Sequence, residues 1–290
     1  MINTLKFITS HPLNKSNKLG ALVRFVQWQF RARISKAPFV HAFTEKSKLY
    51  VSKGETGATG NLYCGLHEFY DMGFLLHLLK PGDLFVDIGA NIGSYTILAT
   101  AEIGAHTISV EPVPATFKRL TNNIDLNKIA DLTLPMNIAL GNKPGVLRFT
   151  KSFDTVNHVA TDQETDTIDV PVDTLDNILK QSNPILLKID VEGFETEVLN
   201  GADNVLQNQS LKAIIIELNG SGGRYGYDEL QIHNKLVNHG FAPFDYNPFA
   251  RTLSARASFS DANTIYIRDA QFVAERLKSA RKIKVRDQQF

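Results

Sequence analysis

Apolar runs and amphipathic segments alternate through most of the chain. Short apolar runs bounded by turn-forming residues are typical of buried strands. Strands are predicted at residues 84–88, 107–111, 132–139, 146–149, 167–172, 184–189, 211–218, 241–246 and 264–268. Apolar residues at helical spacing predict helices at residues 66–80, 115–127, 174–180, 195–206 and 228–238. Strands that alternate with helices predict an α/β fold with a mostly parallel, doubly wound sheet.

The pattern changes at both ends of the chain. Residues 1–17 are polar and predict a loose leader, whereas residues 19–35 predict a basic, aromatic helix. Residues 39–65 predict a small β-hairpin or flap with a flexible tip at residues 54–60. The expected organisation is an N-terminal extension at residues 1–61, a central domain at 62–269 with an exposed polar insertion at 151–166, and a basic C-terminal helix at 270–290.

A glycine-rich turn follows the strand at residues 84–88. Gly89, Asn91 and Gly93 occupy this turn, and a helix can start at Tyr95. Glycine lets the backbone approach a ligand closely, and the first N–H groups of a helix point at whatever lies in such a turn. The spacing lacks the G-x-G-x-x-G order of a dinucleotide site, which argues against an NAD-dependent oxidoreductase.

Two acidic residues indicate which cofactor the turn binds. Asp87 ends the strand, where a carboxylate would repel a pyrophosphate but suits the sulfonium and amino groups of S-adenosylmethionine. Glu111 ends the next strand and can accept both ribose hydroxyls. Together these signals indicate a Rossmann-like class I methyltransferase fold. The alternative is a structural turn in which Asp87 only caps the helix.

A second polar cluster is predicted at the end of the strand at residues 184–189. Lys188, Asp190 and Glu192 alternate along the chain and therefore project to the same side. A lysine inside an apolar strand is costly unless it is paired. Glu217 ends the neighbouring strand at the same carboxyl edge, where open α/β sheets bind their ligands.

Three hypotheses are open for this cluster. In the first, which we favour, Asp190 takes a proton from a substrate hydroxyl, Lys188 tunes its charge, and Glu192 and Glu217 help to orient the hydroxyl. Because a carboxylate near a lysine is a weak base, Asp190 would act mainly by positioning. In the second, a Lys–carboxylate pair only joins two strands. In the third, Asp190, Glu217 and Asn219 hold a magnesium ion; our prediction is that there is no metal site.

The charge of the 290-residue chain is unevenly distributed, although the net charge is only +1. Residues 1–44 hold seven Lys and Arg and no acid, residues 268–290 hold seven basic and three acidic residues, and the rest holds 17 basic and 27 acidic residues. An acidic body is unfavourable for phosphate contacts, so no nucleic-acid partner is expected. With one cysteine, no secretory signal and no apolar run of bilayer length, the expected location is cytoplasmic.

The helix within residues 19–36 has two interpretations. It can lie on a membrane surface or against a partner, because it is both basic and aromatic. It can also pack on the body of the protein with its arginines in water. We favour the second, because apolar residues such as Leu22, Phe25 and Trp28 are spread too widely for one clean face.

The chain resembles the FkbM-family methyltransferases over about residues 62–247. The resemblance is carried by residues 85–93, 111–112, 123, 137–141, 172–176, 188–195 and 215–217, with Glu68 as an acid ahead of the cofactor strand. It implies S-adenosylmethionine-dependent methylation, usually of an oxygen on a sugar, polyketide or related secondary metabolite. It places the cofactor at Asp87, Gly89, Asn91, Gly93 and Glu111, with Asn137 and Leu140 on the adenine side.

The expected function is therefore in-line methyl transfer to a hydroxyl of a small-molecule or glycan acceptor. A rival of a different class is a non-catalytic protein that keeps the cofactor fold and binds an anionic glycan or membrane surface through its basic ends. Nucleic-acid methylation is a weaker alternative, because the chain has no Asn-Pro-Pro-aromatic motif.

Overall fold

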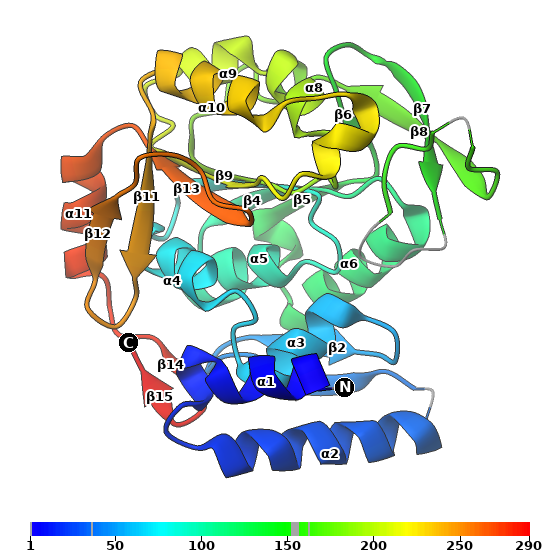
Figure 1. The fold of residues 1–290 in the computed structure, drawn as a ribbon, viewed down its shortest axis with the longest axis vertical. Coiled ribbons are helices and arrows are strands. Elements are labelled where there is room, and N and C mark those ends of the chain that lie inside the picture. The colour runs from blue at the N-terminus through cyan, green and yellow to red at the C-terminus, as the bar shows by residue number, and fades with distance from the viewer. Residues whose placement is uncertain (1, 36, 152–156, 162) are drawn as a thin grey trace.

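An eight-stranded sheet forms the centre of the computed structural model, which describes residues 2–35, 37–151, 157–161 and 163–290 (Figure 1). The strands run in the order β12 (Thr252–Ala255), β11 (Ala242–Asn247), β13 (Asn263–Ile267), β10 (Ala213–Glu217), β9 (Pro184–Ile189), β3 (Leu84–Ile88), β4 (His106–Val110) and β5 (Thr133–Met136). The five strands from β10 to β5 are parallel, and the other three join antiparallel at one edge. The predicted α/β fold is confirmed, although β12 was not predicted.

Successive side chains of the central strands point to opposite faces of the sheet, and helices cover both faces, so the side chains on both sides are buried. Phe85 and Leu186 lie in a core shared with α4 (Phe69–Leu78) and α11 (Ala270–Ser279). Val86 and Leu187 lie in the opposite core, which is shared with α8 (Glu195–Asn200), α9 (Asp203–Gln207) and α10 (Glu229–Asn238). Figure 1 shows these two layers of helices on either side of the sheet. The carboxyl ends of the parallel strands are thereby left to form a site.

The first residues are helical, contrary to the predicted loose leader. Helix α1 (Ile2–Ser10) and a 3-10 helix (Pro12–Asn14) pack on the protein, and Ile8 is completely buried. The Nδ2 of Asn14 donates to the carbonyl oxygens of Ile8 (2.9 Å) and Tyr63 (3.2 Å). Contacts with a distant segment thus give this polar stretch a structure that its local sequence does not specify.

The predicted helix at residues 19–35 is observed, whereas the hairpin predicted over residues 39–65 forms only in the first half of that stretch. Helix α2 (Lys18–Ile34) precedes a hairpin of β1 (Phe39–Ala42) and β2 (Lys48–Val51), with residue 36 outside the described residues. Among the helices in the described part of the chain, none is long and apolar enough to cross a bilayer.

The flexible tip predicted at residues 54–60 is wrong, because most of this stretch belongs to helix α3 (Thr56–Cys64). The Glu55 carboxylate accepts a backbone N–H in the turn that leads into the helix (2.7 Å). At the other end, the Arg286 guanidinium donates to the carbonyl of Tyr63 (2.9 Å). A cationic donor at a helix C-terminus satisfies carbonyls that have no partner within the helix.

Two predicted elements are each divided. The strand predicted at residues 132–139 becomes β5 and β6 (Ala139–Leu140), and β6 joins a separate sheet with β8 (Thr167–Asp173) and β7 (Gly145–Thr150). The helix predicted at residues 195–206 becomes α8 and α9. Gly201 lies between these two helices. Glycine is required there, because a Cβ would lie 2.1 Å from the carbonyl oxygen of Gly141.

The polar stretch predicted as an exposed insertion, residues 151–166, is partly buried. Residues 152–156 and 162 lie outside the described residues. Val159 is only 8% exposed and pairs with Phe149 in a β-bridge, and its carbonyl accepts the hydroxyl of Tyr225 (2.7 Å). This part of the insertion therefore packs against the protein, on Phe149 and Tyr225, and is not an exposed loop.

The C-terminal helix is shorter than predicted. α11 ends at Ser279, and a hairpin of β14 (Lys284–Val285) and β15 (Gln288–Gln289) follows it. Ile283 is completely buried, and Arg281 forms an ion pair with the buried carboxylate of Glu102. Residues 280–290 therefore do not continue the predicted helix; they form a hairpin that is held by contacts with the first half of the chain.

Two asparagines on α6 (Pro114–Asn127) hold the N-terminal hairpin. Asn123 accepts the backbone N–H of Tyr50 and donates to the carbonyl of Ile92 (both 2.8 Å). Asn127 bonds the N–H and the carbonyl of Lys48 (both 2.8 Å). One helical turn apart, these side chains supply the hydrogen bonds that a neighbouring strand would give to β2. Asn123 also ties the hairpin to the glycine-rich turn, which contains Ile92.

Replacing Asn123 by alanine should lower the free energy of unfolding by about 1–3 kcal/mol, because a buried N–H and a buried carbonyl lose their partners. Urea unfolding measures this change. Asn122→Ala, at an exposed position of the same helix, is the matched control and should change stability by less than about 0.5 kcal/mol. Equal stability of the two variants would contradict the role given to Asn123.

Candidate active site

The glycine-rich turn joins β3 to α5 (Ser94–Ile97), with left-handed backbone at Gly89 (φ 78°), Asn91 (51°) and Gly93 (90°). Glycine and asparagine tolerate this conformation best. The backbone N–H groups of Gly89 and Ala90 both donate to the carbonyl of Val110 at the end of β4 (3.0 and 2.9 Å). These bonds fix the turn against the neighbouring strand.

Gly89 is the point at which the two predicted motifs touch. A Cβ on Gly89 would lie 1.8 Å from the backbone oxygen of Asp190. The backbone N–H of Asp190 in turn donates to the carbonyl of Ile88 (3.0 Å). A side chain has no room here, so glycine is required by the contact between two backbones as well as by the turn.

Asp87 caps the helix and also lines the site. Its Oδ2 accepts the backbone N–H of Thr96 (3.0 Å) and the Thr96 hydroxyl (2.6 Å), which also contacts the Ser109 hydroxyl (2.7 Å). Burial raises the pKa of Asp87 to about 6. Asp87 therefore caps the helix, as the alternative hypothesis had it, and it also lines the cavity described below.

Glu111 follows β4 and is buried. Its two oxygens accept the backbone N–H groups of Asn91 (3.0 Å) and Val113 (2.9 Å). Burial raises its pKa to about 7. Asn137, predicted on the adenine side, donates instead to the carbonyls of Glu111 (2.8 Å) and Pro112 (2.9 Å). It thus supports the backbone of Glu111 from behind.

Lys188 is the centre of the second cluster. Asp87, Lys188 and Glu217 project from the same face of the sheet, since their strands pair in register and side chains alternate. The side chain of Lys188 is 2% exposed, its Nζ donates to Oδ2 of Asp190 (2.9 Å), and it lies 5.3 Å from the centre of the Tyr95 ring. Burial would lower the pKa of Lys188, but the surrounding carboxylates, above all Asp190, outweigh burial and raise it.

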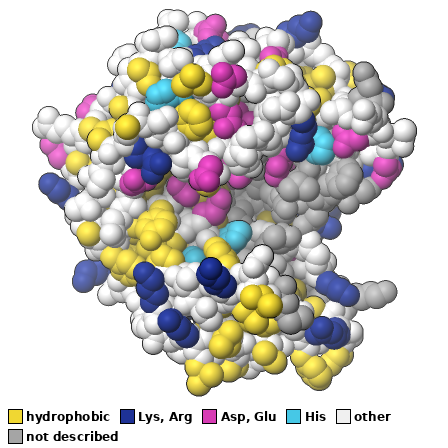
Figure 2. Space-filling view, viewed as in Figure 1, with side chains coloured by type: hydrophobic (Ala, Val, Ile, Leu, Met, Phe, Trp, Pro, Cys, Tyr) yellow, Lys and Arg dark blue, Asp and Glu magenta, His cyan; other side chains and the backbone are white. Residues whose placement is uncertain are grey.

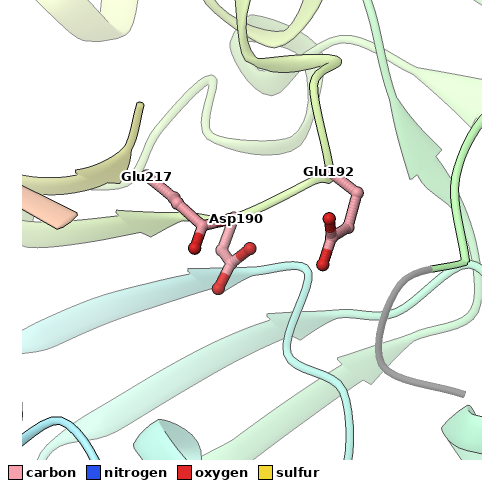
Figure 3. A group of neighbouring side chains, drawn as sticks. All are labelled: Asp190, Glu192 and Glu217. Carbon is pink, nitrogen blue, oxygen red and sulfur yellow. The ribbon is translucent and has the colours of Figure 1, made fainter. Parts of the chain in front are cut away.

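Three carboxylates gather at this end of the sheet (Figure 3). Oxygen atoms of Asp190, Glu192 and Glu217 lie within 4.8 Å of one another. Burial and repulsion by Asp190 raise the pKa of Glu217 to about 9 and that of Glu192 to about 7. At neutral pH, Glu217 therefore carries a proton, and its carboxyl group hydrogen-bonds with Asp190. Asn219, considered as a metal ligand, uses its Oδ1 to accept the N–H of Ser221 (2.9 Å).

The backbone of Glu192 is left-handed, with φ 55°. This conformation costs a residue other than glycine about 1 kcal/mol or more, and such strain gathers at functional sites. The next residue, Gly193, has φ 98°. Glycine is required there, because a Cβ would lie 2.6 Å from the carbonyl oxygen of Ser221. The tight turn keeps the Glu192 carboxylate beside that of Asp190.

The structure adds residues that the sequence patterns did not single out as site residues. The Tyr95 hydroxyl donates to Oε2 of Glu68 (2.8 Å), and Asn263 of β13 donates to Oε1 (2.7 Å). Asn61 of α3 donates to the Ser94 hydroxyl beside the glycine-rich turn (3.0 Å). Of these residues, the sequence pointed only to Glu68, as an acid ahead of the cofactor strand.

One cavity of about 260 Å³ joins both motifs at the carboxyl edge of the sheet. All four predicted catalytic residues line it, together with Asp87, Gly89, Asn91, Glu111 and Leu140. Gly93 and Asn137 do not line it. Further parts of its wall come from α3, with Gly57 and Asn61, and from an apolar side with Ala139 and Phe149.

A doubly wound sheet whose glycine-rich turn and acidic strand ends meet in one cavity defines a Rossmann-like class I methyltransferase fold. The chain belongs to the FkbM methyltransferase family, because the family model described as "Methyltransferase FkbM domain" matches residues 87–243. This match begins at Asp87 and ends in β11, so it contains the two motifs and most of the main sheet. The predicted family is confirmed.

Two curated relatives are named as methyltransferases. The chain is 31% identical over 147 residues to "Hexuronic acid methyltransferase AglP" of Haloferax volcanii. The matched region covers 50% of this chain and 59% of that protein. It is 29% identical over 182 residues to "Methyltransferase 1" of Beauveria bassiana, which covers 53% of this chain and 72% of that protein. The first match thus spans less than two thirds of its relative.

Solved structures with a similar fold include TYW2 of P. horikoshii in complex with MeSAdo, at 14% identity and a TM-score of 0.40, covering 80% of this chain and 70% of that chain. TrmK of M. capricolum in complex with S-adenosyl-homocysteine has 12% identity and a TM-score of 0.38, covering 68% and 66%. Neither similarity is close enough to support any conclusion beyond those drawn from the family match and the strand order.

Gly89→Ala should destabilise the protein by about 3 kcal/mol or more, because the added Cβ collides with the backbone at Asp190 and strains a left-handed turn. Thermal and urea unfolding measure this loss. Gly145→Ala, where a Cβ meets nothing within 4 Å, is the control and should be nearly neutral. A Gly89→Ala variant as stable as this control would show that the two backbones do not touch.

Proposed function

We propose that this chain transfers the methyl group of S-adenosylmethionine to a hydroxyl of a sugar, glycan or related metabolite. The observation that carries the proposal is the single cavity in which the glycine-rich turn and Glu111 meet the Lys188–Asp190 pair. Membership of a methyltransferase family supports it. The activity, cofactor and acceptor of the whole protein rest on this proposal.

The residues of the cavity fit S-adenosylmethionine. Burial raises the pKa of both Asp87 and Glu111, and a ligand with a sulfonium and an amino group would supply the positive charge that buried acids favour. Glu111 would hold the ribose, Asp87 and the turn the methionyl part, and Leu140 with Phe149 the adenine. When bound, the cofactor would supply an electrophilic methyl group, whose bond to a positively charged sulfur would break as the acceptor oxygen bonded the methyl carbon.

The carboxylate cluster would receive the proton that the acceptor hydroxyl loses. Asp190 is already bonded to Lys188 and to the protonated Glu217, so it is a weak base that orients the hydroxyl. Glu192, whose pKa is raised to about 7 by burial and by Asp190, is better tuned to take a proton at neutral pH. We assign orientation to Asp190 and proton acceptance to Glu192.

A groove of about 790 Å³ adjoins the cavity, and His67 and Glu68 line both. The groove contains Phe7, which is 41% exposed, and Tyr70, which is 51% exposed. Exposed aromatic faces of this kind suit the apolar face of a sugar ring. Exposed Lys15, also in the groove, suits a carboxylate. The relative named for hexuronic acid supports an acidic sugar as the acceptor.

The proposal is tested by incubating the protein with S-adenosylmethionine and glucuronic acid, galacturonic acid or their glycosides, with glucose and galactose as neutral controls. Mass spectrometry should find one added methyl group, preferentially on the acidic sugars. The product should survive mild alkali, because a methyl ether is stable where a methyl ester is hydrolysed. No product from any sugar would contradict the acceptor class, and an alkali-labile product would contradict the hydroxyl.

In this assay, Asp190→Asn should lower kcat about 100-fold or more while cofactor binding is kept, because orientation of the hydroxyl is lost. Glu192→Gln should lower kcat and remove the pH dependence near pH 7. Asp131→Asn, at an exposed position outside the cavity, is the matched control. If Glu192→Gln retained the full rate and pH profile, proton acceptance would have to be reassigned.

Affinity for S-adenosylmethionine should rise about tenfold between pH 5.5 and 7.5. The pKa values of Asp87 and Glu111, raised by burial to about 6 and about 7, mean that both acids ionise over this range. A cation binds the ionised acids, so binding releases protons and weakens as the pH falls. Calorimetry in two buffers of different ionisation enthalpy measures both effects. S-adenosylhomocysteine, which lacks the sulfonium, should depend less on pH; equal dependence would argue against a charge contact.

A further inference from the structure

Helix α2 carries apolar side chains on two opposite faces. On its inner face, Ala21 and Trp28 are buried, and Phe25 and Ala32 pack in the same cluster. On its outer face, five apolar side chains are 46–74% exposed: Leu19, Val23, Val26, Phe30 and Ile34. Their spacing of three or four residues, at about 100° per residue, places them in one stripe along the helix. In the described part of the chain, the other elements leave each of these side chains about half exposed or more.

The charged side chains of the segment that carries the stripe are all basic, although Asp287 of the C-terminal hairpin lies close enough to act on Arg24. Residues 1–44 contain no Asp or Glu, and Lys15, Lys18, Arg31 and Arg33 are exposed. In Figure 2, the part of the surface that carries α1 and α2 shows hydrophobic and basic side chains, whereas the acidic side chains gather on the rest of the molecule. Scattered apolar residues are normal on a surface, but a continuous apolar stripe marks an interaction site.

We propose that the outer face of α2 binds the surface of an anionic membrane, with the helix lying in the plane of the interface. The exposed stripe would enter the boundary of the acyl chains, and the basic side chains beside it would contact anionic headgroups. The helix of 17 residues is about 25 Å long, which allows the whole stripe to enter at one depth. In this proposal the helix lies on the membrane surface and does not cross it.

Charge also separates a membrane from a second copy of this chain as the occupant. A symmetric contact through α2 would bring together two segments whose own charged residues are all basic, and like charges across an interface disfavour association. An anionic lipid surface has the complementary charge. Membrane binding does not depend on the proposed methyl transfer, so either can fail without the other.

The test is co-sedimentation with vesicles of phosphatidylcholine alone or with about 30% phosphatidylglycerol. Wild-type protein should bind the anionic vesicles and bind much less at high salt, because salt screens the basic residues. The double variant Val26→Glu and Phe30→Glu should reduce binding at least tenfold. Lys18→Gln should reduce it about fivefold, the contribution of one basic residue at such a surface.

The matched control is Leu230→Glu with Val237→Glu, which places two acids at apolar positions of α10 that are 49% and 44% exposed. It should bind vesicles like wild type, and circular dichroism should show every variant folded. The proposal is overturned if wild-type protein ignores anionic vesicles or if the α2 double variant still binds them. It is also overturned if sedimentation shows a dimer that the α2 double variant dissociates, because α2 would then be a self-association surface.

Discussion

Lys188 is a positive charge held at 2% exposure in the middle of a parallel sheet. Burying an ammonium group is costly unless carboxylates pair with it, and burying carboxylates is costly unless a cation compensates them. Asp190 and Glu68 both favour the charged form of Lys188. The lysine and its acids therefore stabilise one another, and the carboxyl edge of the sheet can keep a concentration of acidic groups that an apolar core would exclude.

The same edge depends on segments from both ends of the chain. α3 supplies Asn61, β13 supplies Asn263, and Arg286 near the C-terminus holds the end of α3. The site is therefore completed by elements outside the segment matched by the family model, residues 87–243. Both ends of the chain therefore contribute to the walls of the cavity or to the contacts that support them.

Local signals predicted much of the fold and many of the site residues. Strands such as residues 84–88 and 184–189 are buried on both faces and consist of continuous apolar runs, which a sequence displays directly. Asp87, Glu111 and Asp190 could be found because each stands at the end of such a strand. The family resemblance placed Asn137 on the adenine side, whereas its side chain supports the backbone of Glu111 from behind; a resemblance between motifs cannot tell a side chain that lines a cavity from one that supports its wall.

The sequence by itself determined the strands at the centre of the sheet, the glycine-rich turn and the acidic strand ends, because these follow from side-chain alternation and backbone sterics within short segments. Tertiary structure alone decided the helical leader, the α3 wall, the Glu68–Tyr95–Asn263 contacts and the C-terminal hairpin. It also separated the apolar residues of α2 into a buried and an exposed face. Those features depend on contacts between segments far apart in the chain, and a linear pattern contains no record of which distant surface covers a given face.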